Sequence, residues 1–219
     1  MNTKYYNHTM LTSFIESATV ILSTFTLSTI TTVLLCYFYD YPFYNPKKTA
    51  NLLSQQINAV IKSSSFLVLE YEFIVVCFMR FDDKPHSMMV TIFHIVNYAF
   101  LIELFYYVYH RFVHTKLLYK PIHSLHHQNV VVYPVDTFYF DIIDITAYVL
   151  CITLPLKFIS LNYIEHAFVL YVYITASYLS HSKLFFTHHF IHHRCFDCNF
   201  CILIPIFDIM CGTYREKIE

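Results

Sequence analysis

The stretch SMMVTIFHIVNYAFLIELFYYVY, residues 87–109, has Glu103 as its single charged residue and ends directly before the sequence HRFVH. A helix needs about 20 mostly apolar residues to cross the hydrocarbon core of a bilayer. A second run, from Ala18 to Tyr39, has no charged residue at all. The sequence therefore predicts two helices that can each cross a membrane alone.

The composition of the whole chain agrees with a membrane protein. Of its 219 residues, 57% are hydrophobic and 13% are charged, whereas soluble domains carry about 25% charged residues. The net charge of −1 argues against nucleic acid as a partner, which requires a basic face, and favours membrane lipid. Lys4 and Glu16 precede the first run and no small-residue cleavage site follows it, so we expect a retained anchor and not a signal peptide.

Three further segments complete the expected architecture. Ile145–Leu156 and Ala167–His181 suit a hairpin that enters the membrane and returns. Ser65–Met79 contains Glu70 and Glu72, so it is either a short span that faces protein or an interfacial helix. The predicted fold class is all-α, an integral membrane helical bundle of about four transmembrane helices.

Basic residues follow the apolar runs in three zones. The zones contain Lys47, Lys48 and Lys62; Arg111, Lys116 and Lys120; and Lys183, Arg194, Arg215 and Lys217. Under the positive-inside rule all three lie on the cytosolic side. Most histidines fall in the same zones, which predicts a cytosolic, histidine-rich cap on the bundle.

The cysteines allow two interpretations. We expect reduced thiols, because all seven cysteines fall in spans or in the cytosolic tail. Cys195, Cys198 and Cys201 nevertheless form a CxxCxxC run, which can hold zinc or begin an iron–sulfur site. The alternative is that they are small apolar residues packed in the tail.

Nine of the 14 histidines fall into three clusters. These are His110 and His114; His123, His126 and His127; and His188, His189, His192 and His193. Spacings of three and four residues place imidazoles on one face of a helix. Uncompensated imidazoles beside a membrane cost desolvation energy, and a metal ion relieves that cost by taking their lone pairs.

The pair at i, i+4 and the two triplets at i, i+3 and i+4 together contain eight imidazoles. Zinc or non-haem iron takes four to six ligands, so eight are too many for one ion and the count predicts two metal ions. Imidazole suits zinc, iron, copper and nickel alike. We favour two irons because an all-imidazole pair with open positions suits redox chemistry on dioxygen, with zinc as the possible substitute.

The clusters resemble the boxes HxxxH, HxxHH and HxxHH of the membrane fatty acid hydroxylase and sterol desaturase superfamily. Flanking residues that match the family pattern are Glu103 and Tyr107 before the first box, and Asn199, Phe200, Asp208, Gly212 and Thr213 after the third. On this resemblance, residues 45–219 form a fatty acid hydroxylase-like domain. Residues 1–44 are an N-terminal segment with the anchor helix.

The resemblance implies nine metal ligands: His110, His114, His123, His126, His127, His181, His189, His192 and His193. The carboxylates of Glu103, Asp141, Asp144 and Asp208 are expected to accept the outward imidazole N–H bonds. The third box begins at His189, because only that register repeats the spacing of HSLHH. His188 then points about 100° away around a helix, and we expect it behind the ligands or exposed to solvent.

The resemblance also implies a function. Two irons would activate dioxygen and remove hydrogen from a C–H bond of a lipid, leaving a hydroxyl group or a double bond. The electrons would come from cytochrome b5 and its reductase, at the endoplasmic reticulum membrane. HSK at residues 181–183 resembles the HSG of sterol methyl oxidases and hydroxylases, which favours a sterol substrate. Sphingolipid or fatty acyl hydroxylation stays open.

Two interpretations from other classes also stay open. One is a non-catalytic membrane protein that binds metal at the same histidines. The other is a membrane protein with bis-histidine haem, although haem needs isolated pairs on facing helices rather than triplets.

Overall fold

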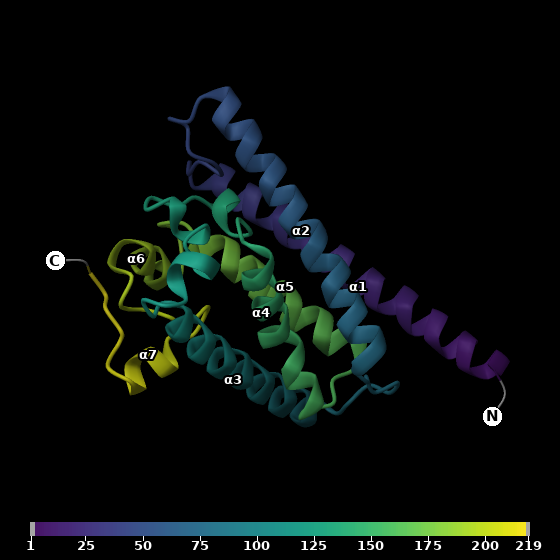
Figure 1. Cartoon of the computed structure of the whole chain (residues 1–219). Helices are drawn as coiled ribbons and strands as arrows, with labels where there is room; N and C mark the ends of the chain where they lie inside the picture. The colour runs from purple at the N-terminus through teal and green to yellow at the C-terminus, as the bar shows by residue number, and fades with distance from the viewer. Residues whose placement is uncertain (1–2, 218–219) are drawn as a thin grey trace.

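The structure is a computed structural model that describes residues 3–217, and it is built from helices (Figure 1). The α-helices are α1 Thr3–Phe38, α2 Ala50–Phe78, α3 Met88–Val113, α4 Ile142–Thr153, α5 Tyr163–Ser180, α6 Thr187–Cys195 and α7 Ile206–Met210. Four shorter turns are η1 Tyr119–His123, η2 His126–Gln128, η3 Pro134–Asp136 and η4 Leu154–Lys157. Residues 3–217 form no β-strand, only an isolated bridge between Asp82 and Asn162, so the predicted all-α class is confirmed.

The long helices lie beside one another and the short elements gather at one end (Figure 1). α1 packs against α5 and α2, α2 packs against α4, and α3 packs against α4, α5 and α7. The core between them is aromatic and aliphatic, with Tyr98, Phe138 and Tyr173 among its fully buried side chains. The loop after α3, together with α6 and α7, forms the end that carries the histidines.

Hydroxyl side chains join α1 to α5. Ser28 Oγ donates to the carbonyl of Tyr171 at 3.2 Å, and Thr31 Oγ1 lies 3.1 Å from the Tyr171 hydroxyl. Thr29 Oγ1 lies 3.1 Å from the hydroxyl of Tyr178. Small polar residues of this kind allow close packing and hydrogen bonding between helices in lipid.

Within residues 3–217, two helices are long and apolar enough to cross a membrane, Ser13–Phe38 within α1 and Met88–Val113 in α3. Each covers all but one residue of a run predicted to span, and both expose large apolar side chains such as Leu27, Ile30 and Phe93. The hairpin arms form the helices α4 and α5. At 12 and 18 residues, these are about 18 and 27 Å long, against about 30 Å of hydrocarbon. Four spans therefore stay a prediction.

The segment Ser65–Met79 is not a separate element. It forms the second half of α2, which begins at Ala50 because the hydroxyl of Thr49 caps the helix by accepting from the backbone N–H of Leu52. Inside the bundle, Glu72 of this helix accepts a hydrogen bond of 2.7 Å from Ser17 Oγ of α1. The Glu72 carboxyl group therefore faces protein.

Asn162 fixes the start of α5. Its side-chain oxygen accepts from the backbone N–H groups of Ile164 and Glu165, both at 3.0 Å, and its own N–H donates to the Glu165 carboxylate at 3.1 Å. This reciprocal arrangement is a capping box.

Replacing the cap tests its contribution to stability. Asn162→Ala should destabilise the protein by about 0.5–2 kcal/mol, because the two backbone donors lose their acceptor. Thermal unfolding in detergent micelles should show a lower midpoint for this variant. Asn162→Ser retains a capping oxygen and should stay closer to the wild-type midpoint; equal losses in the two variants would contradict the capping role.

Candidate metal centre

The nine predicted ligand histidines lie together at one end of the bundle, in two groups. The first contains His110, His114, His123, His127 and His192, and the second contains His126, His181, His189 and His193. Within each group the candidate ligand nitrogens all lie within 4.8 Å of one another. Eight of the nine side chains are buried and His114 is half-buried. Two groups agree with the number of ions predicted from the ligand count.

The second box does not form the regular helix that its spacing predicts. His123 ends the π-helical turn η1, and His126 and His127 lie in the 3₁₀ turn η2. Pro121 within η1 has no N–H to donate and disfavours the α conformation at the residue before it. The irregular turns direct His123 and His127 into the first group and His126 into the second.

The third box is helical as predicted, and α6 serves both groups. His192 contributes to the first group, whereas His189 and His193 contribute to the second. The first box lies at the end of α3, where His110 is in the last turn and His114 is the C-cap residue.

Hydrogen bonds at Nδ1 fix the proton positions of two rings in the first group. His110 Nδ1 donates to the carbonyl oxygen of Phe200 at 2.8 Å, and His192 Nδ1 donates to the carbonyl of Cys198 at 2.6 Å. A carbonyl oxygen can only accept, so each Nδ1 carries hydrogen and each Nε2 of the neutral ring carries a lone pair.

These lone pairs point at other imidazole nitrogens. His110 Nε2 lies 3.1 Å from His123 Nε2, and His192 Nε2 lies 3.1 Å from His114 Nε2 and 3.0 Å from His127 Nε2. His123 carries hydrogen on Nδ1, which donates to the Asp144 carboxylate at 2.7 Å. The Nε2 lone pairs of His110 and His123 therefore face each other. No hydrogen bond can form between two lone pairs, whereas a cation can bind both of them. The donor set fits a metal ion.

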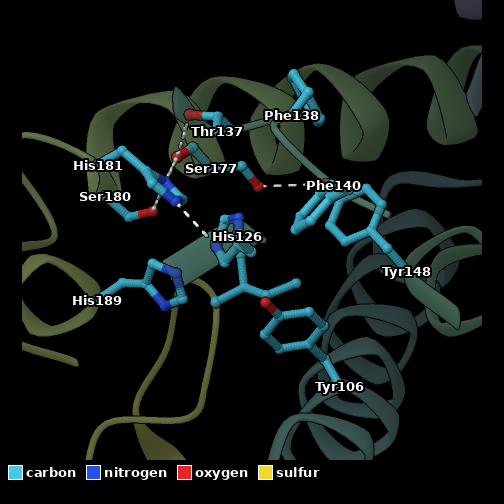
Figure 2. Close-up of a pocket in the computed structure, with 11 residues that line it drawn as sticks. Tyr106, His126, Thr137, Phe138, Phe140, Tyr148, Ser177, Ser180, His181 and His189 are labelled. Carbon is cyan, nitrogen blue, oxygen red and sulfur yellow. Dashed lines mark hydrogen bonds between the residues drawn. The ribbon is translucent and has the colours of Figure 1, made fainter. Parts of the chain in front are cut away.

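The second group has the same character (Figure 2). His181 Nδ1 donates to the carbonyl of Ser177 at 2.8 Å, and its Nε2 lies 3.3 Å from His126 Nε2 and 3.2 Å from His193 Nε2. Among the described residues, Nδ1 of His126, His189 and His193 has no hydrogen-bond partner although it is buried. In His126 and His193 it is Nε2 that faces the group, so the candidate ligand atom of these two rings is Nε2 and the unpartnered Nδ1 lies on the other side of the ring.

A small cavity adjoins the second group (Figure 2). It has room for about one water molecule. Its lining residues are Tyr106, His126, Thr137, Phe138, Phe140, Tyr148, Ser177, Ser180, His181, His189 and Ile202. The cavity therefore combines imidazole nitrogens with an aromatic wall.

Burial keeps the imidazoles neutral. Desolvation, followed by repulsion from neighbouring histidines, lowers the pKa of His127, His192 and His193 well below the usual value. The pKa of His114 falls to about 3 for the same reasons. Neutral rings at pH 7 leave their lone pairs free for a metal ion.

Of the four carboxylates predicted to accept imidazole N–H bonds, Asp144 is the one that does so. It accepts from His123 Nδ1 on one oxygen and from the Tyr109 hydroxyl at 2.6 Å on the other. Asp141 instead caps α4 by accepting from the backbone N–H of Ile143. Tyr109 was not expected from the sequence, where it is one aromatic residue in a long apolar run.

The prediction that Glu103 and Asp208 accept imidazole N–H bonds is wrong. Glu103 accepts from the backbone N–H groups of Ile202, Leu203 and Ile204 at 2.9–3.1 Å. Asp208 accepts from the backbone N–H groups of residues 200 and 201, both at 2.8 Å. The reason is that this buried loop has irregular backbone, whose N–H groups need acceptors.

The residues after the third box hold this loop in place. Thr213 Oγ1 donates to Asp208 Oδ1 at 2.7 Å, and Gly212 adopts a left-handed conformation with φ +70°. Asn199 also has positive φ, and its side-chain amide donates to the carbonyls of His188 and Arg215. The residues after the third box that match the family pattern therefore position the carbonyls that orient His110 and His192.

His188 belongs to neither group. It is buried, and its Nε2 donates to the carbonyl of Ile202 at 3.0 Å. The structure thus places it behind the ligands and not in solvent, in the register that begins the third box at His189.

The expectation of reduced thiols is wrong for one pair, because Cys195 and Cys198 form a disulfide. α6 ends at Cys195, and the left-handed residue Phe196 turns the chain so that the two Cα atoms lie 6.2 Å apart. Cys201 packs elsewhere, with Tyr107 and Phe207. The CxxCxxC run does not converge on a three-thiolate metal site.

Comparison with known proteins agrees with this site. The sequence profile of the fatty acid hydroxylase family matches residues 95–213, more than half of the chain, and this range includes all nine clustered ligand histidines. The chain belongs to the fatty acid hydroxylase family. Protein CER1-like 1 of Arabidopsis thaliana is 27% identical over 135 residues, which cover 51% of this chain. The matched region spans only 22% of that relative, and no solved structure matches significantly.

Asp144 and Asp141 offer a matched test of the outer contacts. Asp144→Asn should weaken metal binding about 10–100-fold, because His123 loses its anionic acceptor. Asp141→Asn keeps an N-capping side chain and should leave metal affinity unchanged. Metal content after dialysis against graded chelator measures both; equal retention by the two variants would contradict the role of Asp144.

His188 and His189 offer a second matched pair. His189→Ala removes one of four candidate ligands in the second group, and should lower the metal content by at least about one ion per chain. His188→Ala should retain the metal content of the wild-type protein. Elemental analysis of the purified proteins checks this, and metal loss from His188→Ala alone would refute the register.

Proposed function

We propose that this chain is a dioxygen-dependent membrane oxidoreductase that hydroxylates or desaturates a lipid. The observation that carries the proposal is the pair of buried histidine groups whose lone pairs oppose one another. Membership of the fatty acid hydroxylase family supports the same reaction class.

The proposed cofactor is a pair of iron ions, with zinc as a possible substitute. The first group would hold one ion and the second group the other. Bound iron would supply the oxidising chemistry with dioxygen. Asp144 and the carbonyls of residues 177, 198 and 200 orient the imidazoles. Burial of the imidazoles limits their contact with water.

An apolar groove supports a lipid substrate. It lies between α3, α5 and the segment before α7, and its lining residues are Ile95, Val96, Ala99, Phe100, Glu103, Phe168, Val169, Val172, Tyr173, Leu203, Ile204 and Ile206. Ile202 lines the cavity beside the second histidine group, and the next residues, Leu203 and Ile204, line the groove. We propose that a lipid tail enters along this groove from the bilayer and reacts at the cavity.

A sterol is our first proposal for the lipid, and it rests on the likeness of HSK at residues 181–183 to HSG. Ser182 Oγ donates to the carbonyl of Leu179, and the ammonium group of Lys183 lies over the ring of Phe190. Because neither residue lines the cavity, sphingolipid or fatty acyl hydroxylation is retained as the alternative. Lipid profiling of cells with and without the protein decides between them.

The proposed electron donor is cytochrome b5 with its reductase. These 219 residues contain a single glycine and cannot form a GxGxxG loop for a dinucleotide, which supports a separate electron donor. Exposed basic residues at the histidine end, Arg111, Lys116, Lys120 and Arg194, suit an acidic donor. We propose that this end lies on the cytosolic side of the endoplasmic reticulum membrane, where the Cys195–Cys198 disulfide would be open to reduction, and that the bundle has about four spans.

The reaction is testable with protein purified anaerobically and loaded with iron. Reduced cytochrome b5 should support oxygen consumption, and mass spectrometry of the lipids should show one added oxygen atom or two lost hydrogens. The His126→Ala/His192→Ala double variant removes a ligand from each group and should lose iron and turnover together.

The rival classes give different results. Two bound irons without donor-dependent oxygen consumption would overturn the proposal in favour of a non-catalytic metal-binding protein. A Soret band in the purified protein would overturn it in favour of a haem protein.

A further inference from the structure

A second cluster of metal-binding side chains lies at the far end of α3 and α5. His86 lies two residues before the start of α3, His94 is in the second turn of α3, and Glu165 is in the first turn of α5. Their ligand atoms all lie within 4.8 Å of one another. His94 and His110 are on the same helix, about 24 Å apart at 1.5 Å per residue, so this cluster is separate from the candidate metal centre.

Glu165 is held in a fixed position. Its side chain is 4% exposed and accepts from the backbone N–H of Asn162 and from the Thr91 hydroxyl. The capping box therefore fixes a carboxylate at this place before any ligand binds. A preformed ligand costs little conformational entropy on binding.

His86 lies between two carboxylates. Its Nδ1 is 2.9 Å from Glu165 Oε2, and its Nε2 is 3.0 Å from Asp82 Oδ2. A neutral ring carries hydrogen on one nitrogen only. If Nε2 donates to Asp82, the Nδ1 lone pair faces the Glu165 carboxylate, and a cation is needed between them. That cation is either a proton on Nδ1 or a metal ion.

His94 distinguishes a metal ion from a proton. Its ring centroid lies 4.7 Å from that of His86. Its Nδ1 is inaccessible to solvent and has no hydrogen-bond partner among the described residues. A proton on His86 leaves His94 without a role, whereas a metal ion uses both imidazoles together with Glu165.

We propose that His86, His94 and Glu165 bind a divalent transition-metal ion of the zinc type, with Asp82 orienting His86 through its outward N–H. Two imidazoles and one glutamate form an established ligand set for zinc, and a carboxylate behind a ligating histidine is a usual outer contact. The ion ties the start of α3 to the start of α5. This site is independent of the proposed oxidoreductase function.

The surroundings give the ion a path from solvent. His86 and Glu165 line an open cleft, whose other charged residues are Glu16, Asp82, Asp83 and Lys84. The excess of acidic groups raises the local concentration of cations.

The test uses the full-length protein in detergent with iron loaded beforehand. After equilibrium dialysis against Zn²⁺, elemental analysis measures iron and zinc per chain together. Wild type should bind one more zinc ion than His94→Gln at equal iron content. His94 makes no side-chain hydrogen bond that the fold requires among the described residues, so this variant should keep its structure.

Two further variants complete the design. Asp82→Asn should weaken zinc binding about 10–100-fold by removing the outer contact. Lys84→Gln changes a charge in the same cleft without removing a ligand and should bind zinc as wild type does. Equal zinc content in wild type and His94→Gln, at equal iron, would overturn the proposal and leave a protonated His86 between two carboxylates.

Discussion

Nitrogen lone pairs that face one another in a dry pocket repel unless a cation lies between them, and this constraint governs one end of the molecule. The facing Nε2 atoms of the two histidine groups lie 3.0–3.3 Å apart. Eight of the nine side chains are buried, so bulk water does little to relieve the repulsion. The supporting hydrogen bonds all act to keep the rings in this otherwise unfavourable arrangement.

The support is arranged in layers. Carbonyl oxygens and Asp144 fix the rings, and the carbonyls of Cys198 and Phe200, which orient His192 and His110, belong to a loop between α6 and α7 that has no regular structure of its own. Glu103 and Asp208 compensate by accepting the N–H groups of that loop, and Glu103 does so from within a helix long enough to cross a membrane. The loop thus links the membrane helix to the metal ligands.

Much of this architecture is legible in the sequence. Apolar runs predicted α1 and α3. The spacing of the histidines predicted eight of the nine side chains that gather and the register from His189, whereas His181 came only from the family resemblance. The division of HSLHH between two groups depends on irregular turns around Pro121, which helical spacing does not describe. Carbonyl acceptors carry no side-chain signal, and the acidic residues that serve the loop look the same in sequence as those that serve a ligand. His94 and Glu165 are too far apart along the chain to be recognised as neighbours.

The nine-residue helix α6 supplies ligands to both groups. Binding of an ion in one group therefore orders the same short helix that the other group needs. The second ion then binds with a smaller loss of conformational entropy than the first. Metal binding should therefore be cooperative, so that a population of molecules divides mainly into forms with no metal ion and forms with both ions bound. If iron is the cofactor, as proposed, a cell with little iron would hold a smaller number of complete centres and few half-filled ones.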